Sequence, residues 1–158
     1  MDPNAKKKAL RLITYGLYVA TSRHGEEFAA GTINWVSQSS FTPPLVMAGI
    51  KVDSRLHAVI AESGVFAIHI VGKDQKDFAT TFFKGADRQG DKLSGFTFES
   101  GSTGAPILID SPAWFECRVI EKVARGDHTI YVGEVVDAGV RREAAPLTLR
   151  DTGFFYGG

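Results

Sequence analysis

The 158-residue sequence has a single cysteine, Cys117, so it cannot form a disulfide within the chain. It has no excess charge of either sign, because eighteen Lys and Arg residues balance eighteen Asp and Glu residues. A balanced chain lacks the net positive charge that attracts proteins to nucleic acids and anionic lipids, so we expect neither as a partner. Apolar runs such as residues 65–71 are too short to span a bilayer, and no apolar signal core follows the N-terminal lysines. We therefore expect a cytoplasmic protein.

Several common site motifs are also missing. The chain contains neither the G-x-G-x-x-G of a dinucleotide-binding turn nor the G-x-x-x-x-G-K-[ST] of a P-loop. It has no G-x-S-x-G nucleophile elbow and no cluster of His, Cys, Asp and Glu with zinc spacing. Any nucleotide must therefore bind by another route, and we expect no metal site.

Glycine and phenylalanine are frequent, with 17 and 11 residues, which suits short strands joined by tight turns. Strand-like segments outnumber helical ones and mostly follow one another as antiparallel neighbours. We expect one domain over residues 1–158, mainly β, built as a Greek-key antiparallel barrel with short flanking helices. The predicted strands are residues 15–22, 28–36, 45–51 and 65–71, short strands within 96–109, and 113–123 and 129–138.

Three short helices are predicted between the strands. Residues 5–13 show an amphipathic pattern, and residues 74–83 place two phenylalanines four positions apart. Asp53 or Ser54 can cap a helix that runs to residue 63, where Gly64 ends it in a left-handed conformation. Residues 37–42 and 84–95 are polar and are predicted to be loops. The aromatic tail of residues 146–158 is expected to dock, either on this chain or on a partner subunit.

Residues 31–44 read G-T-I-N-W-V-S-Q-S-S-F-T-P-P and lead from a predicted strand into the polar loop. The run supplies hydroxyl and amide groups that can hydrogen-bond the edge of a flat heterocycle and a polyol chain. Two prolines interrupt regular pairing and free backbone N–H donors nearby. On residue chemistry alone, an ordinary strand followed by a serine-rich turn is the simpler explanation of the run.

Four motifs in order resemble the flavin-reductase-like family, which has the FMN-binding split-barrel fold. The first is the run of residues 31–44. The second is K-V-D-S at 51–54, where a strand turns into a helix. The third is E-S-G-V-F-A-I at 62–68, and the fourth is G-D-H-T-I-Y-V-G-E-V at 126–135. The resemblance covers almost the whole chain, so it implies the fold of that family.

The resemblance also implies where a flavin binds. One segment would hold the isoalloxazine ring and the ribityl chain, largely through backbone atoms; its residues are Thr32, Asn34, Trp35, Val36, Ser37, Gln38, Ser39 and Ser40. Ser54, helped by Lys51 or Arg55, would contact the phosphate. Independently of the family, Ser54 stands at a helix start, where free N–H groups and the helix dipole favour an anion. Ser54 can equally be a simple N-cap.

The family further implies that His128 lies near the reactive face of the flavin, where it would act as the catalytic residue toward a nicotinamide. A turn residue bonded to its own backbone is the alternative. Trp35 can flank the flavin or simply pack. The remaining histidines, His24, His57 and His69, have no supporting partners in the sequence and are expected to be structural or exposed.

The expected function is a homodimeric flavoprotein that transfers hydride from NAD(P)H to FMN, or to FAD, and passes electrons to an acceptor such as a redox partner protein. The cofactor supplies this chemistry, so no acid–base cluster is needed. One alternative is an electron-transfer flavoprotein that does not oxidise NAD(P)H. Another is a binding barrel for a different ligand such as heme, with His128 or His69 as a ligand.

Overall fold

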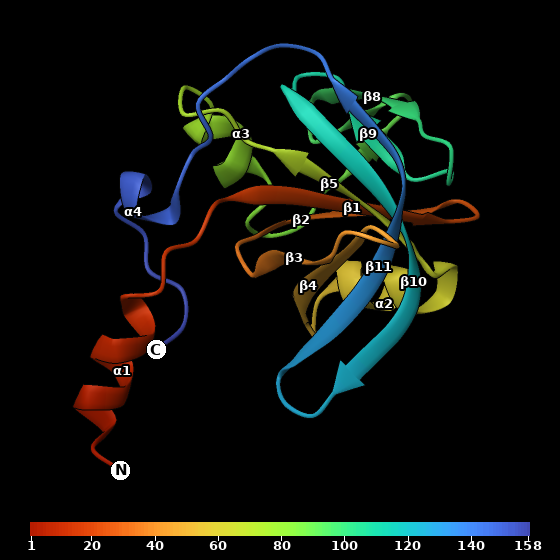
Figure 1. The fold of residues 1–158 in the computed structure, drawn as a ribbon. Helices are drawn as coiled ribbons and strands as arrows, with labels where there is room; N and C mark the ends of the chain where they lie inside the picture. Colours follow the sequence, from red (N-terminus) through yellow and green to blue (C-terminus); the bar gives the residue numbers. More distant parts are fainter.

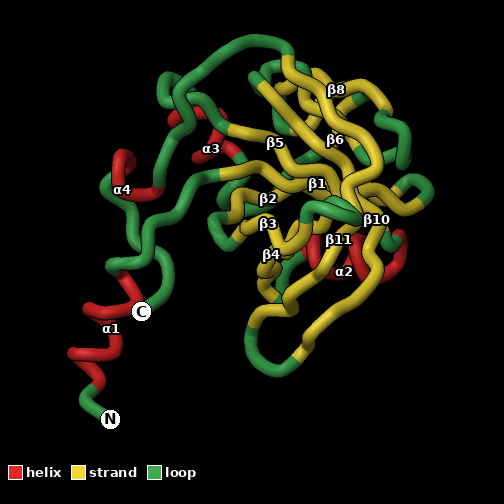
Figure 2. The backbone as a smooth tube through the Cα atoms, viewed as in Figure 1, coloured by secondary structure: helices red, strands yellow, loops and turns green.

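The computed structural model describes residues 1–158 and is built around one seven-stranded sheet in which every pair of neighbours is antiparallel. The strand order is β2-β1-β5-β10-β11-β4-β3. The strands are β1 (Tyr18–His24), β2 (Glu27–Ile33), β3 (Val36–Ser40), β4 (Leu45–Lys51), β5 (Val65–Ile70), β10 (Ala113–Ala124) and β11 (His128–Val140). The strands form one curled body, and the N-terminal helix projects furthest from it (Figures 1 and 2).

The two outer strands of this sheet, β2 and β3, are consecutive in the chain and are separated only by Asn34 and Trp35. Two residues cannot bridge the width of a flat seven-stranded sheet, so the sheet must curl until its edges meet at this point. The result is a barrel with an open seam. The predicted fold class, a mainly β antiparallel barrel with short helices, is confirmed.

A second, four-stranded sheet covers one side of the barrel. It contains β6 (Arg88–Gln89), β7 (Lys92–Leu93), β8 (Phe96–Ser100) and β9 (Pro106–Leu108), paired in sequence order. Two hydrogen bonds join β9 to the barrel: the Thr21 hydroxyl donates to the Pro106 carbonyl at 2.6 Å, and the Leu108 amide donates to Nε2 of His69 at 3.0 Å.

The helices differ in how much they bury. The helix α2 (Arg55–Ser63) packs Leu56, Val59 and Ile60 into the barrel core, and Gly64 ends it at φ 68°, as predicted. The helix α3 (Lys76–Thr81) buries Phe78, while α4 (Leu149–Thr152) is a single turn held by a capping box. The N-terminal helix α1 (Pro3–Arg11) buries no residue and projects from the body beside the C-terminus (Figure 1). No helix is long and apolar enough to cross a membrane.

The structure corrects three sequence-based predictions. The strand predicted over residues 28–36 ends at Ile33, and the predicted loop of residues 37–42 instead forms most of β3. The segment 84–95, also predicted to be a loop, contains the β6–β7 hairpin with Leu93 fully buried. Both segments are polar, and their side chains do not alternate between apolar and polar as in a half-buried strand. Their strands form through backbone pairing, which the sequence pattern does not show.

Candidate functional site

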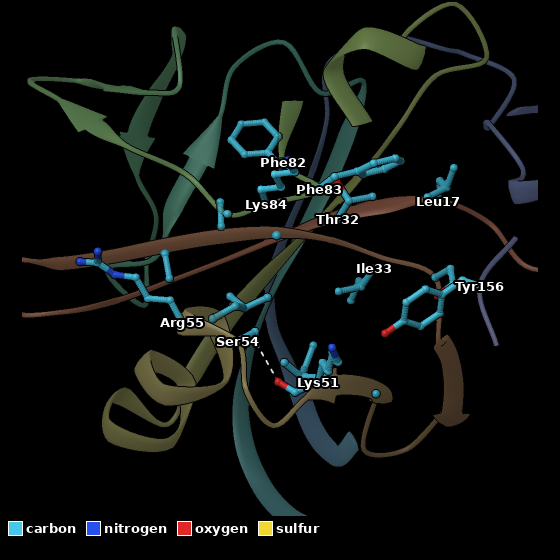
Figure 3. Close-up of a pocket in the computed structure, with 18 of the residues that line it drawn as sticks. Leu17, Thr32, Ile33, Lys51, Ser54, Arg55, Phe82, Phe83, Lys84 and Tyr156 are labelled. Carbon is cyan, nitrogen blue, oxygen red and sulfur yellow. Dashed lines mark hydrogen bonds between the residues drawn. The ribbon is translucent and has the colours of Figure 1, made fainter. Parts of the chain in front are cut away.

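A cavity of about 660 Å³ opens where the seam of the barrel meets α2. Its walls come from the end of β2, the end of β4 with the first turn of α2, the loop after α3, and residues 154–156. Figure 3 shows Phe82, Phe83 and Lys84 on one side of the cavity and Lys51, Ser54 and Arg55 on the opposite side. Segments far apart in the chain therefore build one site.

The first turn of α2 forms an anion-binding end of this cavity. Ser54 is the N-cap: its hydroxyl accepts from the His57 amide at 3.1 Å and donates to the Lys51 carbonyl at 2.8 Å. The amides of Arg55 and Leu56, in the first turn, have no partner within the helix. Since both residues line the cavity, these donors and the helix dipole suit a phosphate.

The charges around the cavity favour the same kind of ligand. Three cations line it, Lys51, Arg55 and Lys84, against the single carboxylate of Asp53. Lys51 pairs with Asp53 at 3.2 Å and Arg55 pairs with Glu27 at 2.7 Å. Both pairs are solvent-exposed and therefore weak, so a phosphate can recruit these cations at little cost.

Two polar atoms at the seam are buried without a hydrogen-bond partner. They are the amide nitrogen Nδ2 of Asn34, a residue that lines the cavity, and the indole nitrogen Nε1 of Trp35. A buried donor left unpaired costs roughly 1–3 kcal/mol, which a ligand acceptor can recover. The Asn34 amide is thus a candidate donor to a ligand in this cavity.

His128 lies at the start of β11, paired in register with Lys51 at the end of β4. Its Nδ1 donates to Oδ1 of Asp127 at 2.8 Å, and with the proton there, Nε2 accepts from the Tyr156 hydroxyl at 2.6 Å. The hydrogen bond from His128 lowers the pKa of Asp127, while burial raises the pKa of Tyr156. The ring of Trp35 lies 4.4 Å from the His128 ring, so side chains hold the imidazole on three sides.

The structure brings half of the predicted site residues to the cavity. Those that line it are Thr32, Asn34, Lys51, Ser54, Arg55 and His128. Those outside the lining are Trp35, Val36, Ser37, Gln38, Ser39 and Ser40, which follow the seam into the outer strand β3. The Thr32 hydroxyl donates to the Ala79 carbonyl at 2.5 Å, so it ties β2 to α3.

Two lining segments were not predicted as site residues. The first is the turn after α3, Phe82 to Ala86, where Gly85 adopts a φ of 95°. The second is the aromatic run Phe154 to Tyr156. The sequence showed that this tail was aromatic and should dock, but contact with the site depends on folding that joins residues about 70 positions apart.

The other histidines and the cysteine lie away from the cavity. His69 is fully buried: its Nδ1 donates to the Val19 carbonyl at 2.9 Å and its Nε2 accepts from the Leu108 amide. Both ring nitrogens are occupied, which leaves none for a heme iron. Cys117 is fully buried, and burial raises the pKa of its thiol to about 12, so it is an unreactive core residue.

The family model for the flavin reductase like domain matches residues 10–158. The chain belongs to this family. NADH-dependent flavin reductase StyB of Pseudomonas fluorescens is 31% identical over 150 residues, which cover 94% of this chain and 85% of StyB. The flavin reductase PheA2 structure has a TM-score of 0.80 with 29% identity, over 94% of this chain and 93% of PheA2. The predicted family is confirmed.

Two other relatives are longer than this chain, and one similar solved structure contains NAD and FAD fragments. The high molecular weight rubredoxin of Moorella thermoacetica is 30% identical over 89% of this chain, which spans 62% of its length. Diflavin flavoprotein A 1 of Synechocystis is 31% identical over 86% of this chain, which spans 24% of its length. The Streptomyces globisporus NADH:FAD oxidoreductase SgcE6, in complex with NAD and FAD fragments, gives a TM-score of 0.79 with 26% identity, covering 94% and 90% of the two chains.

The names of StyB, PheA2 and SgcE6 agree with the predicted flavin reductase function, and those of StyB and SgcE6 include NADH. The residues present fit a flavin. The α2 start with its cations suits a phosphate, the unpaired Asn34 amide suits a ring or polyol acceptor, and the volume is of the size that cofactor sites have.

Proposed function

We propose that this protein binds FMN, or FAD, in the cavity and reduces it with NAD(P)H, passing the electrons to an acceptor. The observation that carries the proposal is the buried, unpaired Nδ2 donor of Asn34 in a cavity whose wall includes the start of α2. A polar donor is seldom buried unless something accepts from it. The bound flavin would accept hydride and release electrons.

The roles of the chain's own residues are binding and orientation. The Arg55 and Leu56 amides, with Ser54 as the cap, would hold the phosphate, while the side chains of Lys51 and Arg55 would add charge. Asn34 would donate to an acceptor on the flavin. His128, fixed by Asp127, would position the nicotinamide. The other predicted contacts, Trp35 through Ser40, would act through the backbone of the seam.

We further propose that the protein is a homodimer. In the single chain, α1 buries nothing, and Leu10, Leu12 and Ile13 are 43%, 72% and 49% exposed. Ile120 and Val123 on the β10–β11 hairpin are also about half exposed. Apolar surface of this kind commonly marks an interface between proteins. Light scattering coupled to size exclusion tests it; a monomer at all concentrations contradicts it.

The flavin proposal is tested by the visible spectrum of the purified protein, before and after added FMN, and by anaerobic mixing with NADH and NADPH. We expect retained or restorable flavin bands that bleach with at least one nucleotide. Arg55→Ala should weaken binding of FMN but not of riboflavin, which lacks the phosphate. Lys92→Ala, an exposed cation outside the cavity, is the matched control. A protein that binds neither flavin contradicts the proposal.

A second candidate is an electron-transfer flavoprotein that is reduced by a partner protein. It is favoured by the similarity to a high molecular weight rubredoxin and to a diflavin flavoprotein, which are longer than this chain. The anaerobic experiment separates the two functions. Bleaching by NADH or NADPH supports the reductase, whereas bleaching only by a reduced protein donor supports electron transfer.

A further inference from the structure

The aromatic segment Phe154–Tyr156 lies across the cavity and is held by contacts with three separate elements. The Phe154 ring packs edge-on against Phe83 at 5.3 Å and lies 4.9 Å from the Lys76 ammonium group. The Arg11 guanidinium group of α1 lies 4.8 Å from the Phe155 ring. The segment is thus docked in a defined position at the site.

Tyr156 makes the contact closest to the proposed chemistry. Its hydroxyl lies 2.6 Å from Nε2 of His128, and its ring packs edge-on at 5.6 Å from Trp35. Figure 3 shows the ring entering the cavity with its hydroxyl directed toward Lys51. Because Asp127 already holds Nδ1, both nitrogens of the imidazole are occupied by the protein itself.

This arrangement has a direct consequence for ligands. The tyrosine hydroxyl takes the one position from which a bound molecule could hydrogen-bond Nε2 of His128. Its ring lines the cavity beside the His128 ring, in space that a nicotinamide at His128 would need. A nicotinamide that hydrogen-bonds Nε2 of His128 must therefore displace Tyr156.

The segment can be displaced without disturbing the core of the barrel. Phe154, Phe155 and Tyr156 are 38%, 73% and 42% exposed, so the segment lies at the surface of the molecule. Gly153 and Gly157 flank the segment with φ values of 74° and 87°, and glycine gives both ends freedom to change direction.

We propose that Tyr156 is an internal competitor for the nicotinamide nucleotide at His128 and thereby sets the affinity of the site for that substrate. The inference rests on the proposed function, because it takes NAD(P)H as the molecule that contacts His128. The direction of the expected change in affinity is specific to this role of Tyr156: loosening the segment should tighten nucleotide binding.

The test compares Tyr156→Phe and Tyr156→Ala with the unchanged chain, using NAD⁺ and NADP⁺ as unreactive probes in titrations and NADH and NADPH in steady-state assays. Loss of one hydrogen bond in Tyr156→Phe should lower the dissociation constant and the KM about two- to tenfold, with kcat unchanged. Tyr156→Ala should lower them at least as far. Tyr15→Phe removes a hydroxyl from a residue outside the cavity lining and should change neither.

Acrylamide quenching of tryptophan fluorescence, measured without nucleotide, reports whether the segment has loosened over Trp35. Quenching should rise in Tyr156→Ala. Weaker binding in both Tyr156 variants would mean that the segment forms part of the nucleotide site, and unchanged binding would mean that it does not compete; either overturns the inference. Failure of the proposed function is a different result, in which the unchanged protein is not bleached by either nucleotide.

Discussion

His69 and His128 lie in two regions of this molecule and differ in their hydrogen-bond partners. His69 lies fully buried where the small sheet meets the barrel, and its partners are the backbone atoms of Val19 and Leu108. His128 lies at the cavity, and its partners are the side chains of Asp127 and Tyr156.

The difference in partners gives His69 a structural role and leaves His128 able to bind a ligand. Backbone partners in β1 and beside the barrel cannot move without unfolding, so His69 is a fixed part of the architecture. Side-chain partners can rotate away, and one of them belongs to a half-exposed segment between two glycines. A histidine of the second kind can exchange its partner for a ligand, whereas one of the first kind cannot.

Removal of His69 should produce the largest effect on stability. His69→Ala leaves the Val19 carbonyl and the Leu108 amide unpaired in a cavity, and we expect a loss of about 3–5 kcal/mol in the free energy of unfolding. Urea denaturation measures it. His24→Ala, an exposed histidine, should stay within about 0.5 kcal/mol of the parent. Equal small losses of stability in both variants would show that His69 is not a fixed part of the architecture.

Acid should destabilise the protein through the same residue. Burial lowers the pKa of His69 to about 4, below the value of about 6.5 in an unfolded chain. The unfolded state therefore binds the proton first, and stability falls as the pH drops from about 6.5 to 4, by about 3 kcal/mol at most. Denaturation at a series of pH values measures the slope. His69→Gln does not titrate, so it should flatten the slope of the free energy of unfolding against pH. An unchanged slope would mean that carboxylates cause the loss of stability in acid.

His128→Ala should have its main effect on the reaction. We expect the KM for NAD(P)H to rise about tenfold, equivalent to roughly 1.4 kcal/mol, because a ligand contact is lost. The free energy of unfolding should change by less than in His69→Ala, since the hydrogen-bond partners of His128 are side chains that reach solvent. Steady-state kinetics and urea denaturation check both halves. A variant that unfolds readily while its KM is unchanged would mean that His128 is a structural residue, as His69 is.

Asn34 combines the burial of His69 with the location of His128, and we expect its removal to affect the ligand and not the fold. Its Nδ2 has no partner to lose, and Asn34→Ala should leave the free energy of unfolding of the flavin-free protein nearly unchanged. FMN affinity should fall about fivefold, by roughly 1 kcal/mol, as measured by flavin fluorescence. Ser22→Ala, which removes a buried hydroxyl paired with the Val65 carbonyl, should show the reverse pattern.

Much of the fold could be predicted from local signals. Ser54 as an N-cap, Gly64 as a left-handed stop and the apolar stripe of α2 all appear in the structure as expected. The strand Leu45–Lys51 was predicted with both ends correct. These elements succeed because short-range chemistry and burial agree in them.

The site was less accessible to prediction. Ser54 and His128 were identified from motifs, but Phe83, Lys84 and Tyr156 reach the cavity only through long-range packing. No local pattern marks a residue as facing a cavity assembled from four separate segments. Asn34 lines the cavity but Ser37 does not, because the chain leaves β2 and enters β3 between them. The sequence does not show where that change of strand occurs.

The polar composition of β3 has a meaning apart from ligand binding. This strand is an outer edge of the barrel sheet, with backbone groups on its free side that another chain could pair with. An exposed edge with apolar side chains favours aggregation, and Ser37, Gln38, Ser39 and Ser40 offer almost none. The serine-rich run therefore helps to keep the open seam of the barrel from recruiting other chains during folding and at high concentration.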